Sequence, residues 1–244
     1  MIRRCNVTDM NISTDDFSGE LDEAEIYKDR LPLIGSSILD LGCGSAQHSA
    51  AIADLDSTIR LTALEVDKVQ HAKNLRSIKK PNIIFKLAGA EQIPEPDASF
   101  DIVMLFKSLH HVPLDFLGQA LTEIHRVLKP NGLVYISEPI FAGAFNEILR
   151  LFHDEQGVRR AAFEAVREAV ADGYFALVEQ IFFHAATHFT DFADFESKII
   201  EATHSEHCLS SAVLAEVKVR MESHKGADGI RFSSPMRVDL LRKV

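Results

Sequence analysis

Residues 37–46 read Ser-Ile-Leu-Asp-Leu-Gly-Cys-Gly-Ser-Ala, and this stretch decides the fold. The short apolar run at its start is typical of a strand covered on both faces in a parallel sheet. Gly42 and Gly44 permit a tight turn and leave room for a ligand beside the main chain. A helix expected from about Ser45 would direct its first N–H groups to the same edge. The stretch therefore predicts a nucleotide-type site at the carboxyl end of the first strand.

Composition indicates a globular protein that acts on a small molecule or another protein. The chain has 244 residues, 46% hydrophobic and 25% charged, which allows one domain with an insertion. No apolar run reaches the roughly 18 residues that span a bilayer, and the N-terminus lacks an apolar signal core. The net charge of −10 disfavours nucleic acid, and the basic pairs 79–80 and 159–160 are expected to be solvated helix surface. Three cysteines without metal-like spacing favour a reducing cytoplasm.

Apolar runs alternate with amphipathic segments through the first 140 residues. This alternation predicts right-handed βαβ units and a parallel sheet. Strands are expected at 37–41, 59–64, 82–87, 100–106 and 133–137, with helices at 20–31, 45–55, 68–77 and 114–128. Residues 236–241 alternate apolar and charged side chains, as an edge or antiparallel strand does.

The sequence as a whole predicts three parts. Residues 1–19 are polar and are expected to form a flexible N-terminus. Residues 20–139 and 225–244 would form the α/β core. Residues 140–224 show only helical periodicity, at 145–152, 158–171, 192–202 and 209–224, and predict a helical insertion. Its many phenylalanines are expected to be mostly core, with a subset roofing an acceptor pocket or forming a homodimer interface.

Glu65 ends the second strand about 20 residues after the glycine turn, where an acid can accept hydrogen bonds from both ribose hydroxyls. A dinucleotide-binding dehydrogenase is the competing interpretation. Its fingerprint requires a third small residue, where this chain has Gln47. Asp40 would also repel a pyrophosphate, whereas it suits a cationic amino-acid group.

Four motifs in the correct order resemble those of class I S-adenosylmethionine-dependent methyltransferases. Residues 38–44 are similar to motif I, 64–67 to the ribose motif, 99–104 to the fourth-strand motif, and 128–133 to the turn into the fifth strand. The resemblance covers residues 20–140, and within the class the chain is similar to the methyltransferase type 11 family. It implies a Rossmann-like fold, with a doubly wound, mostly parallel, seven-stranded sheet and an inserted helical lid.

The resemblance also implies S-adenosyl-L-methionine as cofactor and a set of binding positions. Asp40 would hold the ammonium group, and Glu65 the ribose, with Val66 packing on the adenine. Gly89 stands where the family usually has an acid for the adenine amino group, so adenine recognition would fall to the Gly89 and Ala90 backbone or to Glu91. The complete expected cofactor set is Asp40, Gly42, Cys43, Gly44, Glu65, Val66, Gly89, Ala90, Glu91, Phe106 and Lys107.

A general base is needed only if the methyl acceptor must lose a proton. The candidates are His111 after the fourth strand, Glu138 after the fifth and His153 in the insertion. No metal is expected, because His184 and His188, and the run 204–208, lack further ligands at suitable spacing. The acid of metal-dependent catechol-type methyltransferases is absent after the fourth strand, and so are the motifs associated with nucleobase methylation.

The sequence thus predicts methyl transfer to an oxygen, nitrogen or carbon atom of an unidentified small molecule. The alternative is a non-catalytic protein that binds the cofactor and uses the helical insertion as a partner or dimer surface. The intact motif I and ribose acid favour the enzyme.

Overall fold

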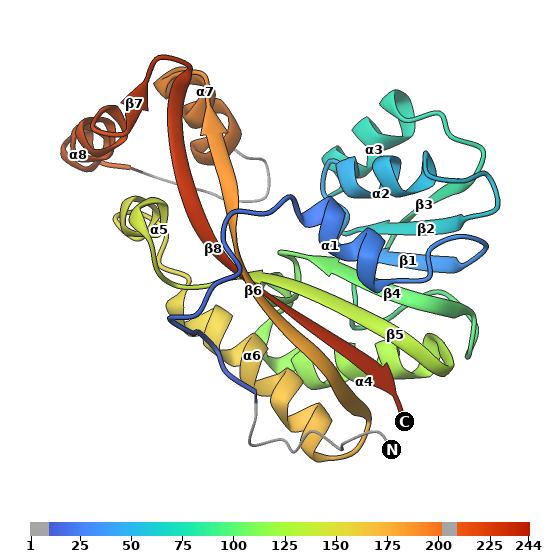
Figure 1. Ribbon diagram of the computed structural model, residues 1–244. Coiled ribbons are helices and arrows are strands. Elements are labelled where there is room, and N and C mark those ends of the chain that lie inside the picture. The colour runs from blue at the N-terminus through green and yellow to red at the C-terminus, as the bar shows by residue number, and fades with distance from the viewer. Residues whose placement is uncertain (1–9, 202–208) are drawn as a thin grey trace.

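The computed structural model describes residues 10–201 and 209–244 of the chain. Its centre is one mixed sheet in the order β3-β2-β1-β4-β5-β8-β6, with the short β7 paired to β8 (Figure 1). β1, β2, β3, β4 and β5 are parallel, whereas β8 runs antiparallel between β5 and β6. The expected sheet is confirmed as a path of seven strands, with β7 as a side arm. The bounds are β1 Ser37–Leu41, β2 Arg60–Glu65, β3 Ile83–Leu87, β4 Phe100–Phe106, β5 Leu128–Pro139, β6 Phe175–Phe189, β7 Lys225–Gly226 and β8 Gly229–Lys243.

Helices cover both faces of the sheet, as Figure 1 shows. Successive strand residues point to opposite faces, so Ile38 and Leu39 of β1 belong to different cores. One core packs against α1 (Glu23–Arg30) and α2 (Gln47–Ala53), and α3 (Lys68–Ser77) follows β2. The other core packs against α4 (Leu117–Val127) and α6 (Gln156–Ala171).

The expectation of a wholly helical segment over residues 140–224 is wrong. The helices α5 (Ala144–Leu149) and α6 come first, and the 15-residue strand β6 then returns to the sheet. A register shift between Leu177 and Glu179 breaks the alternation of side chains along β6. Its partner β8 lies far along the chain, so no local period marks β6 as a strand.

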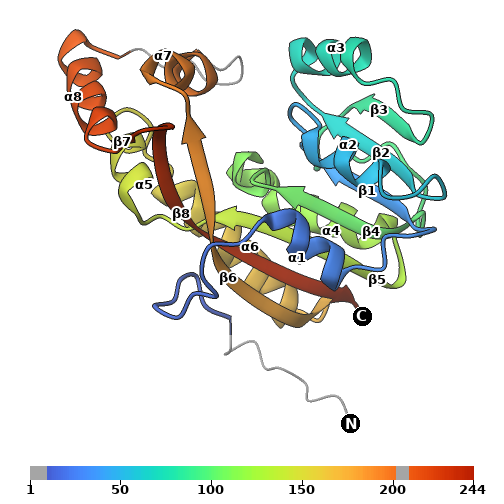
Figure 2. The same cartoon turned by 45° about the horizontal axis from the view of Figure 1, so that its top comes forward.

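The long strands β6 and β8 extend beyond the sheet and carry a small subdomain at one end (Figure 2). It contains α5, α7 (Phe192–Phe195), a π-helical turn (Glu196–Ile200) and α8 (Ser211–Glu222). Its own core includes Phe189, Phe195, Phe232 and Met221, all at most 3% exposed. Several of the phenylalanines in this region are therefore packing residues, as expected.

The prediction of a flexible N-terminus is wrong for residues 10–19. Met10 is buried, the Ser18 N–H donates to the Phe182 carbonyl (2.9 Å), and Gly19 accepts from the His184 N–H (2.8 Å). This segment therefore lies along β6. Residues 1–9 are outside the described part of the chain. No helix among the described residues is long and apolar enough to cross a membrane.

Candidate active site

The turn after β1 is held by backbone bonds to the next strand. Gly42 and Gly44 have positive φ angles of 70° and 52°. The N–H groups of Gly42 and Cys43 both donate to the Leu64 carbonyl, at 3.0 and 2.9 Å. A Cβ atom at Gly42 would lie 2.7 Å from the Ser108 Cβ, so the turn requires glycine for space as well as for conformation.

Glu65 lies against this turn, at the end of β2. Its side chain is buried and accepts from the Gly44 N–H (2.8 Å) and the Asp67 N–H (2.9 Å). Asp67 in turn caps α3 by accepting from the Val69 N–H. A carboxylate is therefore fixed beside the glycine turn, at the place predicted for a ribose ligand.

Asp40 is the least solvated acid of this edge, with 1% of its surface exposed. One carboxylate oxygen accepts from the Ser49 hydroxyl (2.5 Å), and the other has no partner among the described residues. Burial raises the pKa of Asp40 to about 7, although the Ser49 hydrogen bond opposes the shift. A buried carboxylate with an unpaired oxygen suits a cationic ligand group, because the cation would compensate for the lost hydration.

Asn74 of α3 is a site residue that the sequence analysis missed. It is 1% exposed and donates its amide hydrogen to the Gly44 carbonyl (2.7 Å), while Gln70 donates to its oxygen. The same amide approaches the Cys43 sulfur at 3.7 Å. Burial raises the pKa of the Cys43 thiol, so Cys43 is a packed wall of the turn. Only the inward position of Asn74 on α3 could have indicated this role.

The expected adenine side is open and apolar. Val66 is 64% exposed and Leu87, at the end of β3, is 46% exposed. A side chain added at Gly89 would collide with the carboxylate of Glu91, which folds back over that position. The Glu91 carboxylate thus occupies the space of the side chain that Gly89 lacks.

Phe106 and Lys107 lie at the end of β4 within a polar and aromatic cluster. The Phe106 ring stacks on His48 with centroids 4.0 Å apart, and Tyr27 of α1 lies 5.8 Å from it. Burial, and then the nearby Lys107 charge, lower the pKa of His48 to about 4. The hydroxyl of Tyr27 is buried without a partner in the described structure. Tyr27 and His48 were not predicted as site residues.

A second cluster lies where β4 and β5 end, around His110. Glu138 accepts from the Leu109 N–H (3.0 Å) and contacts His110 Nδ1 with its other oxygen. On the opposite side, His110 Nε2 lies 3.6 Å from the Glu155 carboxylate. Burial opposes protonation, but the two carboxylates outweigh it and raise the pKa of His110 to about 9. His110 is therefore an imidazolium between two carboxylates at neutral pH.

Glu155 connects this cluster to the start of α6. It accepts from His153 Nε2 (2.9 Å) and from an Arg159 guanidinium nitrogen (2.5 Å). Burial raises the pKa of Glu155, but His110 and Arg159 outweigh this and hold it well below its usual range. The Arg159 side chain is 10% exposed, so the expectation that it is solvated helix surface is wrong.

Two of the predicted base candidates lie near Glu155, which was not itself predicted: His153 contacts it directly and His111 lies close to it, whereas Glu138 contacts His110 instead. His111 is exposed and its ring centroid lies 4.1 Å from that of His110. His110, His111 and Glu155 place one possible ligand atom each within 4.8 Å of one another. The pairing of an imidazolium with carboxylates accounts for this geometry without a metal ion, and the absence of a metal stays a prediction.

His184 and His188 lie on β6 rather than on a shared helix face, and residues 204–208 are outside the described range.

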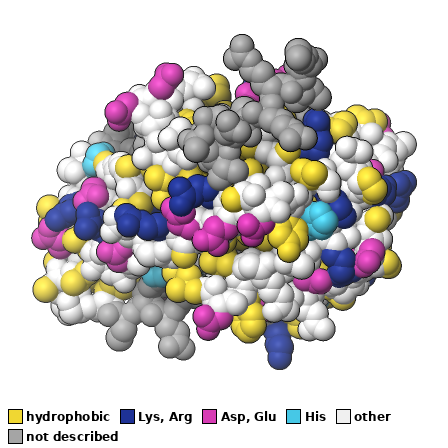
Figure 3. Space-filling view, turned by 90° about the horizontal axis from the view of Figure 1, so that it is seen from below, with side chains coloured by type: hydrophobic (Ala, Val, Ile, Leu, Met, Phe, Trp, Pro, Cys, Tyr) yellow, Lys and Arg dark blue, Asp and Glu magenta, His cyan; other side chains and the backbone are white. Residues whose placement is uncertain are grey.

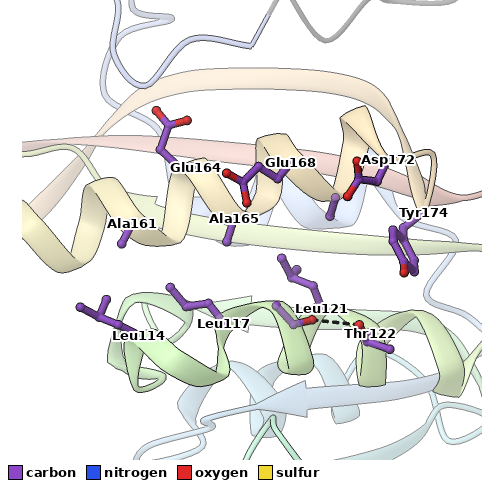
Figure 4. A pocket seen from close by; sticks show the side chains of 12 residues that line it. Leu114, Leu117, Leu121, Thr122, Ala161, Glu164, Ala165, Glu168, Asp172 and Tyr174 are labelled. Carbon is purple, nitrogen blue, oxygen red and sulfur yellow. Dashed lines mark hydrogen bonds between the residues drawn. The ribbon is translucent and has the colours of Figure 1, made fainter.

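A separate cavity of about 560 Å³ lies between α4 and α6 (Figure 4). Leu114, Leu117 and Leu121 form its apolar side, and Glu164, Glu168 and Asp172 lie along the α6 side. None of the predicted cofactor or base residues lines it, so we do not assign it to the active site.

Comparison with known proteins identifies the domain. Residues 39–136 match the methyltransferase domain family. These residues contain the glycine turn, Glu65 and the His110 segment. This part of the chain is a methyltransferase domain.

The relatives of this methyltransferase domain are similar over about half of their own length. A 27-O-demethylrifamycin SV methyltransferase of Amycolatopsis mediterranei is 33% identical over 134 residues, covering 51% of this chain and 48% of that one. A ubiquinone/menaquinone biosynthesis C-methyltransferase of Rickettsia bellii is 34% identical over 115 residues (42% and 44%). An O-methyltransferase of Aspergillus nomiae is 34% identical over 128 residues (49% and 55%).

Solved structures extend the fold similarity to nearly the whole chain. A Bacillus halodurans C-125 protein with a provisional description as a methyltransferase aligns with a TM-score of 0.62 at 16% identity, covering 91% of this chain and 98% of that one. The [4+2]-cyclase SpnF aligns with a TM-score of 0.57 at 20% identity (90% and 78%). These similarities concern the fold alone.

Proposed function

We propose that this protein catalyses transfer of a methyl group from S-adenosylmethionine to an oxygen, nitrogen or carbon atom of a small molecule. The observation that carries the proposal is the buried Glu65 carboxylate on the Gly44 N–H, next to Asp40 with its unpaired oxygen. A ribose ligand and an ammonium ligand at these places match the sugar and the amino-acid part of this cofactor. The relatives described as O- and C-methyltransferases of small molecules support the same reaction class.

The same proposal assigns the remaining cofactor contacts along this edge. Asp40 binds the ammonium group, Glu65 the ribose hydroxyls, and exposed Val66 one face of the adenine. Glu91 accepts from the adenine amino group, because its carboxylate lies over Gly89. Gly42, Cys43, Gly44 and the Ala90 backbone shape the pocket, and Phe106 and Lys107 border its methionine end.

S-adenosylmethionine supplies a methyl group on a positively charged sulfur. The chain must place the acceptor atom in line with that methyl group and exclude water. His111 is the proposed base for an acceptor that loses a proton, with a ligand atom within 4.8 Å of one of Glu155. His110 and Glu138 act as positioning residues, since both carboxylate oxygens of Glu138 are engaged. His153 is the second base candidate.

Nucleic acid is a poor acceptor on physical grounds. The net charge is −10, and Figure 3 shows acidic and basic side chains interspersed over one face rather than gathered in a basic patch. The homodimer and the cytoplasmic location stay predictions.

Turnover of methyl-labelled S-adenosylmethionine against a panel of small phenols, quinols, amines and carboxylic acids tests this function. We expect labelled product with at least one class and none after His111→Ala when the acceptor is a phenol. Tight binding of the cofactor with no turnover on any panel member would favour the alternative, a non-catalytic cofactor-binding protein.

A further inference from the structure

A cavity of about 180 Å³ opens beside Glu138, where α6 begins. Four segments of the chain form its walls: residues 12–13, residues 138–142 at and beyond the end of β5, the start of α6, and Arg237 of β8. Glu138 and Arg159 line this cavity and also belong to the His110 cluster. The cavity therefore adjoins the proposed reaction centre.

Three arginines line the cavity, and they differ in how far their side chains are buried. Arg237 is 3% exposed; its Nε donates to Asp239 (2.9 Å) and one Nη donates to the Ile12 carbonyl (3.0 Å). Its guanidinium also lies over the Phe163 ring at 4.5 Å. Arg160, in contrast, is exposed and lies at the rim.

Arg159 has a donor that the protein does not satisfy. Its two Nη atoms donate to Glu155 and to Asn146 (3.1 Å), while its buried Nε has no partner among the described residues. A buried N–H of a charged group without an acceptor is unfavourable, and it is satisfied if a ligand brings an acceptor atom. This donor is the second observation, besides the cavity, that points to a ligand.

The charges around the cavity leave a positive excess. Asp239 compensates Arg237, and Glu155 compensates Arg159. Glu138 is the one acid that lines the cavity, and it is engaged by His110 and the Leu109 N–H. No ion pair to Arg160 is present in the part of the chain that the structure describes. Ile12, Ile140 and Phe141 add an apolar wall.

We propose that this arginine pocket, formed by Arg159, Arg160 and Arg237, binds a carboxylate of the methyl acceptor. The inference rests on the proposed function and names the acceptor class as a carboxylic acid with an apolar body. A guanidinium presents parallel N–H groups that match the two oxygens of a carboxylate. The apolar body packs on Phe141, and the remainder of the molecule extends from the pocket toward the His110 cluster.

The test measures the dissociation constants of benzoate, as the probe, and of benzamide, as its uncharged analogue. The full-length protein is saturated with S-adenosylhomocysteine in both measurements. We expect benzoate to bind with a dissociation constant of about 10 mM or tighter, as a small fragment does, and benzamide to bind about tenfold more weakly. Arg160→Gln should weaken benzoate binding about fivefold or more, and Arg160→Lys should restore part of it. Arg167→Gln is the matched control, since Arg167 lies on the same helix but pairs with Glu164 outside the pocket.

Four results would overturn the inference. They are no saturable benzoate binding, equal binding of benzamide, an Arg160→Gln variant that binds as the wild type does, and an equal loss in Arg167→Gln. Displacement of benzoate by a lower concentration of inorganic phosphate would assign the pocket to phosphate instead and contradict the proposal. Binding of S-adenosylhomocysteine is measured first: its absence contradicts the proposed function, whereas its presence without benzoate selectivity overturns only the acceptor class.

Discussion

The glycine-turn edge and the His110 cluster are built in different ways. At the edge, Glu65 and Asn74 hold the turn through its backbone N–H and carbonyl groups. All of these groups come from the turn after β1, the end of β2 and α3, which are neighbours in the chain. In the His110 cluster, side-chain charges contact one another. They come from three separate segments: His110 follows β4, Glu138 lies near the end of β5, and Glu155 and Arg159 lie at the start of α6.

This difference suits the two regions to different tasks: one can bind the same ligand in many enzymes, and the other can vary from enzyme to enzyme. Backbone groups do not change with the side chains of the turn, so the edge is suited to a cofactor that many enzymes share. A cluster of side-chain charges can change by single substitutions and by pH, so it is suited to a particular acceptor. We therefore expect that each region can be perturbed without the other.

The largest expected effect is that of Glu65→Ala on the edge. Loss of charged hydrogen bonds to both ribose hydroxyls should weaken S-adenosylhomocysteine binding about 100-fold or more, as measured by calorimetry. Glu25→Ala, on the exposed face of α1, is the control and should leave the affinity unchanged. Wild-type affinity in Glu65→Ala would remove this residue from the site.

The His110 cluster should make stability depend on pH. The pKa of His110 is about 9 in the fold against 6.5 for an ordinary histidine, so its stabilisation is complete below pH 6.5 and is lost as the pH rises through 9. We expect the free energy of unfolding in urea to fall by up to about 3 kcal/mol across this window. His110→Gln should abolish the slope while leaving S-adenosylhomocysteine affinity at pH 7 within about twofold. A slope that persists in the variant would assign it to other groups.

Asn74→Ala tests the bond that closes the turn from α3. It removes the amide donor of the Gly44 carbonyl and leaves only the weak Cys43 thiol contact (3.8 Å), so we expect a loss of about 2 kcal/mol in unfolding free energy and about tenfold in cofactor affinity. Asn82→Ala is a matched control, since Asn82 also donates to a carbonyl (Ala53, 2.9 Å) but away from the turn. If both variants lose only stability, Asn74 has no part in ligand binding.

The smallest effect concerns the proton on Asp40. At pH 6 the carboxyl is mostly protonated, because burial raises its pKa to about 7, and an arriving ammonium group favours the ionised form. Binding of S-adenosylhomocysteine should therefore release up to about one proton at pH 6 and none at pH 9. Calorimetry in two buffers of different ionisation enthalpy measures this release, and Asp40→Asn should abolish it. Equal release in the variant would contradict the assignment.

The contrast also explains how much the sequence could predict. β1, β4, α3 and the place of Glu65 follow from local apolar runs and turn residues, and the structure confirms them. β6 was missed because its partner is distant in the chain and a register shift interrupts its alternation. The burial of Arg159, and the role of Glu155, depend on how α6 packs against the ends of β4 and β5, which no local pattern encodes. Asn74 was missed because a polar residue on an amphipathic helix has no distinctive spacing.

The central claim is that the edge formed by Gly42, Gly44 and Glu65 binds a sulfonium nucleoside rather than a dinucleotide. Calorimetric titration of the wild-type protein with S-adenosylhomocysteine and, separately, with NAD⁺ tests it most directly. The account predicts one-to-one, micromolar binding of S-adenosylhomocysteine that excess NAD⁺ does not displace. No binding of S-adenosylhomocysteine, or tighter binding of NAD⁺, would contradict it.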